Sequence, residues 1–371
     1  MQWIEGKGVN TKNISYRFIT GSYTGGKEGE GVSVYEYDAT TGYSQAIEGV
    51  NDVINTSFLA FSPDSEFVYA AGENGDASLV YAMKFDRATG SMHVINKVKA
   101  GGADPCYLSV TEKHVITANY SGGSISVFGR KADGSLTEAL QVVRHTGSSI
   151  NADRQGAAHV HQAIFTPDGK YLIVNDLGTD YTTVYRYNPD GTAQVLTAID
   201  SIQSNLGGGP RHLCFHPHPE AVTGADATRA YIIYILHELD GKISTVAIDR
   251  EGRLKPLYST TVAIRENIRT GAADIHITSD GRFLYATNRG TANDITCFAI
   301  SDKGEPEFVQ QVATGGNGPR NFALTPDERF IFVAHQQSGI ATVFSRNPQT
   351  GKLTNTGKTV CAPQAVCLLF Y

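Results

Sequence analysis

Seven times along this 371-residue chain, an apolar, aromatic-rich run ends in a short polar turn that closes on a glycine. The run before each glycine has the character of a strand, as in VSVYEYD from Val32 and ATVFSR from Ala341. A strand-and-turn repeat of about 50 residues suits one four-stranded propeller blade. We therefore predict an all-β fold, a seven-bladed β-propeller of four-stranded antiparallel blades, as a single domain over residues 16–371 after an N-terminal extension, residues 1–15. The seven glycines are Gly42, Gly90, Gly134, Gly191, Gly252, Gly304 and Gly351.

A second repeat lies inside the first and consists of a strand, a Ser/Thr-Pro/Ser-Asp turn and another strand, which together form a β-hairpin. SFLAFSPDSEFVYAA from Ser57 and QAIFTPDGKYLIVND from Gln162 are two copies. The first blade lacks the first strand of this hairpin, and the matching run, QAVCLLFY, occurs only at residues 364–371. We predict that this C-terminal strand pairs with the strand that contains residues 17–19 and closes the ring, because closure removes open sheet edges.

Composition and charge exclude several classes of protein. The formal net charge of −6 argues against a nucleic-acid partner, and no apolar run is long enough to cross a membrane. The five cysteines are odd in number, lie mostly in apolar runs and show no CxxC spacing, so we expect buried thiols and a reducing compartment. No export signal is visible at the N-terminus. These features predict a cytoplasmic monomer or weak homo-oligomer, with an exported precursor whose signal has been removed as the alternative.

A propeller collects side chains from every blade at the mouth of its central channel. In each hairpin, the residue that begins the first strand (its lead position) lies beside the residue that leaves the second strand (its exit position). A structural ring would repeat small or apolar residues there, whereas here polar residue types differ from blade to blade, which predicts a ligand site. The lead positions are Ser57, Cys106, His161, Arg211, Ala273, Arg320 and Gln364, and the exit positions are Tyr23, Glu73, Tyr120, Asp176, Glu238, Arg289 and Gln336.

Two lead positions are arginines in matching Pro-Arg pairs that follow glycine-rich segments, GGGPRH and GGNGPRN. Either arginine alone is more simply a solvated rim charge. As an equivalent pair, Arg211 and Arg320 indicate an anion site, because guanidinium groups match carboxylate and phosphate geometry. Glu238, in HELDG, is either a rim acid paired with an arginine or a general base above the channel.

His159 and His161 alternate by two, so both can face one side of an extended segment. No third ligand follows at a metal-binding spacing, and we predict no metal or other cofactor. His276 lies within the first strand of its blade, where a hydrogen-bonded core histidine is at least as reasonable as a catalytic one. The long polar segment 144–158, which contains Arg154, leads directly into His159, and we expect it to overhang the same mouth.

Several of these segments together resemble one known family, the seven-bladed β-propeller lactonases. They are NADRQGAAHVH (151–161), GPRHLCFHP (209–217), HELDG (237–241), DIHITSDGRFLYATNRG (274–290) and TGGNGPRNFAL (314–324). The family includes propeller-type 6-phosphogluconolactonase and the related fungal 3-carboxy-cis,cis-muconate lactonizing enzyme, and the likeness covers nearly the whole chain. The resemblance implies catalytic roles for His159 or His161, Arg211, Glu238 and Arg289. His237 replaces the family's usual asparagine and Asp274 its usual glutamate, which leaves the lactone open.

The resemblance implies hydrolysis of an anionic sugar lactone, with 6-phosphogluconolactone as the expected substrate. Such a reaction needs an activated water, a group that stabilises the oxyanion and an anchor for the substrate. We expect Glu238 or the histidine pair to activate water, Arg289 to face the oxyanion, and Arg211 and Arg320 to hold the anion. Further predicted substrate-binding residues are His276, Tyr120, Glu73, Gln336 and Arg154. The alternatives are a lactonizing cycloisomerase acting on a carboxymuconate-like dicarboxylate, and a non-enzymatic propeller scaffold, against which the blade-specific rings argue.

Overall fold

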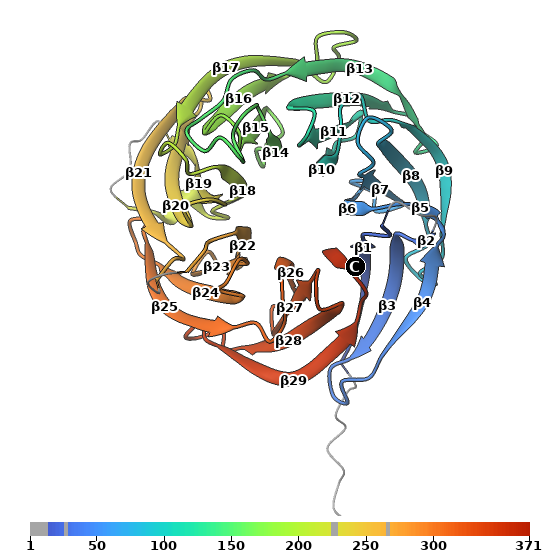
Figure 1. Cartoon of the computed structure of the whole chain (residues 1–371), viewed down its shortest axis with the longest axis vertical. Coiled ribbons are helices and arrows are strands. Elements are labelled where there is room, and N and C mark those ends of the chain that lie inside the picture. The colour runs from blue at the N-terminus through green and yellow to red at the C-terminus, as the bar shows by residue number, and fades with distance from the viewer. Residues whose placement is uncertain (1–13, 26–28, 224–228, 265–267) are drawn as a thin grey trace, which may run out of the picture.

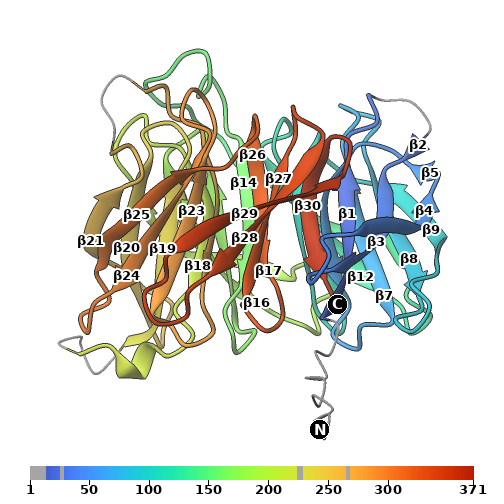
Figure 2. The ribbon, with the colours of Figure 1, turned by 90° about the horizontal axis from the view of Figure 1, so that it is seen from below.

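The computed structural model describes residues 14–25, 29–223, 229–264 and 268–371. These residues form seven four-stranded antiparallel sheets, which are arranged as blades around a central axis (Figure 1). Seen from the side, the blades form a disc whose strands run between its two faces (Figure 2). The predicted all-β, seven-bladed architecture is confirmed.

The strands of each blade follow one another along the chain, from the axis outward, except in the first blade. Blade 1 consists of β30 (Ala365–Phe370), β1 (Ser15–Ser22), β3 (Val32–Asp38) and β4 (Ser44–Val50), and blade 2 of β6 (Thr56–Phe61), β7 (Phe67–Gly72), β8 (Leu79–Phe85) and β9 (Met92–Lys99). Blade 3 consists of β10 (Pro105–Val110), β11 (His114–Asn119), β12 (Ser124–Arg130) and β13 (Leu136–Arg144), and blade 4 of β14 (Val160–Phe165), β15 (Tyr171–Asp176), β16 (Tyr181–Tyr187) and β17 (Leu196–Gln203). Blade 5 consists of β18 (Pro210–Phe215), β19 (Arg229–His237), β20 (Lys242–Asp249) and β21 (Leu254–Thr261). Blade 6 consists of β22 (Ala272–Ile277), β23 (Phe283–Asn288), β24 (Asp294–Ile300) and β25 (Pro306–Ala313), and blade 7 of β26 (Pro319–Leu324), β27 (Phe330–His335), β28 (Ile340–Arg346) and β29 (Leu353–Cys361). Outside the blades, β2 (Gly29–Glu30) pairs in parallel with β5 (Asp52–Val53), and a short 3-10 helix, η1 (Pro219–Ala221), follows β18.

Blade 1 is built from both ends of the chain. The C-terminal strand β30 pairs antiparallel with β1, with Phe18 opposite Phe370 and Ile19 opposite Leu369. This confirms the predicted closure of the ring. Of the predicted N-terminal extension, residues 1–15, residues 1–13 lie outside the described part of the chain, and β1 begins at Ser15.

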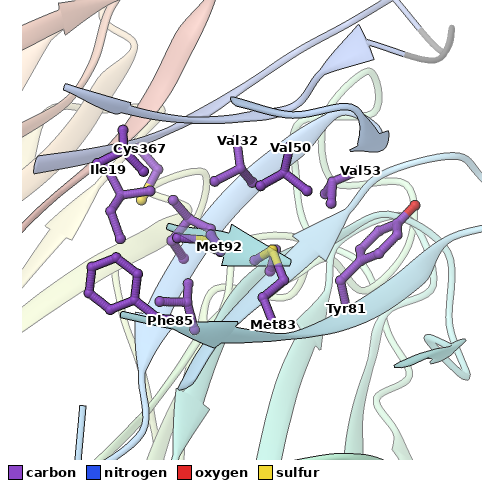
Figure 3. Packing of buried hydrophobic residues seen from close by; sticks show 13 residues of the cluster. Ile19, Val32, Val50, Val53, Tyr81, Met83, Phe85, Met92 and Cys367 are labelled. Atoms are coloured by element: carbon purple, nitrogen blue, oxygen red, sulfur yellow. The ribbon is translucent and has the colours of Figure 1, made fainter. Parts of the chain in front are cut away.

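Alternating side chains of a strand pack against the two neighbouring blades, because successive residues of a strand point to opposite faces of its sheet. In β8, Tyr81 and Met83 belong to a cluster shared with blade 1, whereas Val80 and Ala82 belong to one shared with blade 3. Figure 3 shows the first cluster, in which Val32 of blade 1 and Met83 take part. Among the described residues, each boundary between neighbouring blades contains one such buried cluster. Hydrophobic burial between blades therefore holds the ring together.

Each innermost strand carries a β-bulge near its start. In β14, Val160 pairs with Asp176 and Gln162 with Asn175, which leaves His161 between them without a ladder partner. A bulge of this kind changes the direction of a side chain, so the lead positions point away from the regular sheet. The bulged residues of β6, β10, β18 and β26 are Ser57, Cys106, Arg211 and Arg320, and those of β22 are Ala273 and Asp274.

Two predicted ring positions are wrong by a small shift in register. In blade 1, Ala365 pairs with Ser22 and Cys367 with Gly21, so the bulged residue is Val366 rather than Gln364. In blade 4, Asp176 is still part of the ladder, and the exit position is Leu177. The bulges determine which residue leaves the sheet, and the strand pattern of the sequence does not show their exact position.

One turn glycine and one cysteine differ from the others of their kind. Six of the seven turn glycines have φ between 72° and 82°, a left-handed conformation that favours glycine, but Gly191 does not. The expectation of buried thiols holds for Cys106, Cys297 and Cys367. Cys214 is only partly buried, and Cys361, which ends the outermost strand β29, is exposed; all five cysteines are free.

The contribution of β30 to folding can be tested by truncation. Leu368 is buried in the cluster between blades 7 and 1, and Cys367 in the cluster between blades 1 and 2. Deleting residues 364–371 removes both contacts and leaves β1 as an open edge, so we expect loss of the cooperative unfolding transition, measured by circular dichroism in denaturant. The milder Leu368→Ala should lower the free energy of unfolding by about 2–5 kcal/mol.

The control for this series is Phe308→Ala, which alters an exposed aromatic residue on the outer strand β25 and should change stability little. A truncated protein with the unfolding midpoint of the full-length chain would contradict the role given to β30.

Candidate active site

Eight of the fourteen predicted lead and exit positions meet in one cavity of about 410 Å³ at a mouth of the propeller. Its wall receives side chains from all seven blades, which explains why no short segment of the sequence contains the whole site. The lining residues are Tyr23, Glu73, Asp104, Cys106, Tyr120, Ser121, Arg154, His161, Glu238, Arg289 and Arg320.

Three guanidinium groups surround the carboxylate of Glu238, which follows β19 in blade 5. Arg211 Nε and Arg289 Nη2 lie 2.9 Å and 2.8 Å from Glu238 Oε2. Arg154 Nη2 lies 2.6 Å from Oε1. Both carboxylate oxygens are therefore occupied, and the cluster has an excess of two positive charges. Such an excess in a partly desolvated cavity attracts anions, whatever the net charge of the protein.

The protonation state of Glu238 follows from this arrangement. Burial alone raises the pKa of the carboxyl group, but the charges of Arg289, Arg211 and Arg154 outweigh burial and hold the pKa of Glu238 far below its usual range. Glu238 is thus ionised at every pH at which the protein would be assayed. An ionised carboxylate can accept a proton, although its low pKa makes it a weak base until a bound anion offsets the arginines.

Arg211 lies beneath Glu238 and does not line the cavity. Its side chain is only about 1% exposed. Its Nε donates to Glu238, and its Nη1 donates to the carbonyl oxygen of Ala273 in the next blade. Burial, followed by the charge of Arg289, lowers the pKa of Arg211 to about 10. The structure therefore places Arg211 as a support for Glu238, whereas the sequence suggested a direct anion anchor.

Arg320 occupies the equivalent lead position in blade 7 and is placed very differently. Its guanidinium group makes no hydrogen bond to the described part of the chain. It lies over the ring of Tyr23, 5.5 Å from the ring centroid, and its Nη2 is 4.0 Å from Glu73 Oε1. Because the side chain is 17% exposed and lines the cavity, its donors are available to a bound anion.

Arg289, at the exit position of blade 6, combines both situations. Its Nε donates to the carbonyl oxygen of Gly271 at 2.9 Å and its Nη2 contacts Glu238, so the side chain is fixed at two points. Its Nη1 makes no hydrogen bond within the described residues, and the side chain lines the cavity. Arg289 can therefore present one preorganised donor to a ligand.

The structure separates the two histidines of the HxH segment. His161 lines the cavity, and burial followed by the charge of Arg211 lowers its pKa well below the ordinary value, so its imidazole is neutral. His159 instead stacks on Tyr120, with ring centroids 4.5 Å apart, and its Nδ1 lies 3.0 Å from the carbonyl oxygen of Tyr120. Of the two candidates, only His161 reaches the lining of the cavity, and His159 supports Tyr120.

His276 belongs to a separate polar network and does not line the cavity. Its Nε2 lies 3.0 Å from Asp274 Oδ2, and His212 Nδ1 lies 2.8 Å from Asp274 Oδ1. The amide of Asn321 donates to the same carboxylate at 2.5 Å. The ring of His212 in turn contacts that of His161, with centroids 5.3 Å apart. The network is therefore one layer of side chains behind the cavity.

The predicted substrate-binding residues Tyr120, Glu73 and Arg154 line the cavity, whereas Gln336 lines an adjoining pocket of about 790 Å³. Arg154, Glu238 and Arg289 are shared by both. The two pockets are thus halves of one depression, separated by the ion cluster.

Segment 144–158 reaches over this mouth as expected, because Arg154 bridges Tyr120 and Glu238. The segment is fixed by Asp180, which accepts hydrogen bonds from Ser149 and Gln155. The same carboxylate accepts the backbone N–H groups of Gly207 and Gly209. One buried aspartate therefore fixes both the segment and the glycine-rich approach to Arg211.

Sequence reasoning missed Asp104 and Ser121 in the lining. Asp104 lies two residues before the bulge at Cys106 and has a φ of 53°. Asn55, Gly209, Gly318 and Gln364 hold the matching left-handed position in other blades. This run of Asn, Asp and Gly residues is the signal that would have located Asp104, and it also explains the misplacement of Gln364.

The family of seven-bladed β-propeller lactonases matches this chain over residues 17–370. The chain belongs to this family. It is 33% identical over 342 residues to a 6-phosphogluconolactonase of Formosa agariphila, which spans 90% of this chain and 94% of the relative. It is 31% identical over 366 residues to a 6-phosphogluconolactonase of Bacillus subtilis, spanning 97% and 99% of the two chains. Among solved structures, the periplasmic gluconolactonase of Pseudomonas aeruginosa has a TM-score of 0.86 and 32% identity, covering 96% of this chain and 99% of that one.

The described residues of this lactonase-family chain lack two further features. They contain no helix with the length and apolar character that a membrane span requires. Nor do they contain a group of three His, Cys, Asp or Glu side chains placed to hold a metal ion.

The ion cluster predicts an acid-dependent contribution to stability. The pKa of Glu238 is lower in the folded protein than in the unfolded chain, where a glutamate has a pKa of about 4.3. Its stabilising effect is therefore complete above that value and is lost as the pH falls toward the folded pKa. We expect Glu238→Gln to have a lower Tm than the wild type at pH 6, and the difference to shrink steadily toward pH 3.

Glu307→Gln, on the exposed edge of blade 6, is the control and should keep the wild-type Tm over the same range. Equal melting of wild type and Glu238→Gln at pH 6 would contradict the cluster's structural contribution.

Proposed function

We propose that the protein hydrolyses a sugar lactone that carries an anionic group, with 6-phosphogluconolactone as the first candidate. The observation that carries the proposal is the guanidinium of Arg320, which has no hydrogen-bond partner in the described chain while lining the same cavity as the Glu238 cluster. Largely buried guanidinium donors without a hydrogen bond are unfavourable, so a site of this kind suits an anionic ligand. The relatives named 6-phosphogluconolactonase support the same substrate class.

The chemistry proposed is attack of water on the lactone carbonyl carbon, followed by breaking of the bond to the ring oxygen. Glu238, with both oxygens fixed, accepts a proton from the attacking water. The negative charge that develops on the carbonyl oxygen faces the free donor of Arg289. Such a preorganised donor in a cavity acts more strongly than in water. Arg320 holds the phosphate, which orients the lactone between the two groups.

A bound anion also changes the basicity of the site. The negative charge of the phosphate offsets the excess positive charge of the arginines, which otherwise depress the pKa of Glu238. Glu238 therefore becomes a better base when the substrate is present than in the empty cavity. The neutral imidazole of His161 lies in the same wall and orients the attacking water.

A lactone panel tests the proposal. 6-Phosphogluconolactone, gluconolactone and a carboxymuconate-type dicarboxylate are offered to the purified protein, and the spontaneous hydrolysis rate is subtracted for each. The Pseudomonas relative named gluconolactonase makes the unphosphorylated lactone the second candidate. We expect the highest kcat/KM with the phosphorylated lactone. Absence of catalysed hydrolysis with every lactone would overturn the proposal, and lactonization of the dicarboxylate alone would replace it.

The two arginine lead positions should differ in their effect on substrate choice. Arg320→Ala should raise KM for 6-phosphogluconolactone by roughly ten- to a hundredfold, the loss of a charge-assisted hydrogen bond, and affect gluconolactone much less. Arg211→Ala should lower kcat for both lactones alike and lower the Tm, because it removes the buried support of Glu238.

The exposed Arg250 on an outer turn supplies the control Arg250→Ala, which should leave both lactones and the Tm unchanged. Equal KM effects of Arg320→Ala on both lactones would show that Arg320 does not bind the phosphate.

Glu238→Gln tests the chemical step directly. The substitution keeps the shape of the side chain and removes its capacity to accept a proton, so kcat should fall by about 10²–10⁴, the usual contribution of a positioned general base. The fall is measured at a temperature well below the Tm of the variant, since the ion cluster also stabilises the fold. A near-normal kcat with only a lowered Tm would assign Glu238 a structural role alone.

A further inference from the structure

The cavity holds a second glutamate, across the ring from Glu238, whose surroundings are the opposite in character. Glu73 follows β7 in blade 2, whereas Glu238 follows β19 in blade 5, and the two blades lie on opposite sides of the ring (Figure 1). Both line the same space of about 410 Å³. A sugar lactone bound in that space would therefore have both carboxyl groups in the surrounding wall.

The partners of the two glutamates differ. Three guanidinium groups contact Glu238 at 2.6–2.9 Å, whereas the one guanidinium within 4.0 Å of Glu73, among the described residues, is that of Arg320 at that limit. The close partner of Glu73 is a hydroxyl group: Tyr23 donates to its Oε1 at 3.0 Å. A hydroxyl group can donate or accept a hydrogen bond, so it can stay bonded to a carboxyl group in either protonation state. Guanidinium groups can only donate, so they favour the ionised carboxylate.

The reaction proposed above needs a proton donor at the leaving oxygen. When the ring opens, the oxygen that leaves the carbonyl carbon is a sugar alkoxide, a strongly basic group. A positioned acid that protonates it typically contributes about 10²–10⁴ to the rate. Glu238 is ionised and beside the water, and the arginines do not release protons readily. Within the described lining, Glu73 and Asp104 are the remaining carboxyl groups, and Asp104 is fixed by the backbone N–H of Gly75.

We propose that Glu73 is the general acid of the hydrolysis and donates the proton to the ring oxygen as it leaves. This inference rests on the proposed function. In the complete step, the water oxygen bonds to the carbonyl carbon while its proton moves to Glu238. The bond between that carbon and the ring oxygen then breaks, and the proton of Glu73 moves to this oxygen. Glu238 then releases its proton to the solvent, and Glu73 takes up a proton from the solvent. The net reaction converts lactone and water to a hydroxy acid.

The groups that face Glu73 support this assignment. Burial raises the pKa of Glu73, and the charge of Asp104 raises it further. The charge of Arg320 and the hydroxyls of Tyr23 and Ser57 lower it, but the resulting pKa of Glu73 lies above the ordinary value. The thiol of Cys106 also interacts with Glu73. An anion bound to Arg320 weakens the main lowering influence, so substrate binding favours the protonated acid. Two carboxyl groups whose environments drive their pKa values apart are the usual pattern of an acid and a base in one site.

The test is Glu73→Gln, assayed with 6-phosphogluconolactone across pH and corrected for spontaneous hydrolysis. The wild type should lose kcat/KM on the alkaline side as Glu73 ionises. The variant should show a kcat lower by about 10²-fold or more, little change in KM, and no such alkaline limb. With dihydrocoumarin, whose phenolate leaving group needs no protonation, Glu73→Gln should retain near wild-type activity while Glu238→Gln does not.

Tyr23→Phe is a second variant, which tests the proposal if Glu73→Gln does not fold. It removes a hydroxyl that lowers the pKa of Glu73, so the alkaline limb should move to higher pH. Three results would each overturn the proposal. They are a Glu73→Gln enzyme whose kcat is within threefold of the wild type, a Glu73→Gln enzyme in which only KM changes, and a Tyr23→Phe enzyme whose alkaline limb of kcat/KM stays at the wild-type pH. A wild type without lactonase activity would instead overturn the proposed function itself, so the two failures can be told apart. The matched control is Glu307→Gln.

Discussion

The pairing of β30 with β1 is the constraint on which the rest of the molecule depends. Each blade has two apolar faces, and a face is covered only if another blade packs on it. Six blades in a row would leave one face at each end exposed to water. Because the chain returns to supply the innermost strand of its own first blade, the seven buried clusters form a continuous circle. The geometry of the cavity depends on that circle, because the residues that line the cavity come from all seven blades.

The β-bulges convert this repeating scaffold into a site. A regular inner strand would direct its side chains only toward the two neighbouring blades. The extra residue at the start of the strand breaks the ladder and redirects its side chain, and in blades 3, 4 and 7 this side chain lines the cavity. The residue at the bulge differs between blades that share one backbone geometry: it is a serine in blade 2, a histidine in blade 4 and an arginine in blade 5. The scaffold is repetitive, and the chemistry is not.

The sequence was sufficient to predict the fold, the closure and most of the residues that meet at the mouth, because strand patterns and glycine turns are local signals. It was not sufficient to rank those residues. Arg211 and Arg320 share the same local sequence, yet one is buried under Glu238 and the other faces open space. Arg211 pairs with Glu238, the exit residue of its own blade, whereas the acid near Arg320 is Glu73, which comes from another blade. Pairing between blades has no local signature, so neither this distinction nor the placement of Asp104 followed from the chain alone.

Four arginines at one mouth thus have distinct tasks, set by how many of their donors the protein already uses. Arg211 donates to Glu238 and to the backbone of Ala273, whereas Arg289 Nη1 and the guanidinium group of Arg320 make no hydrogen bond within the described residues. Arg154 comes from a segment between blades and closes the cluster from outside. Removing any of these charges would change the protonation of Glu238 or Glu73 as well as the binding of an anion. Binding and proton transfer are therefore coupled in this cavity through shared positive charge, and an anionic substrate adjusts the acid and the base by the act of binding.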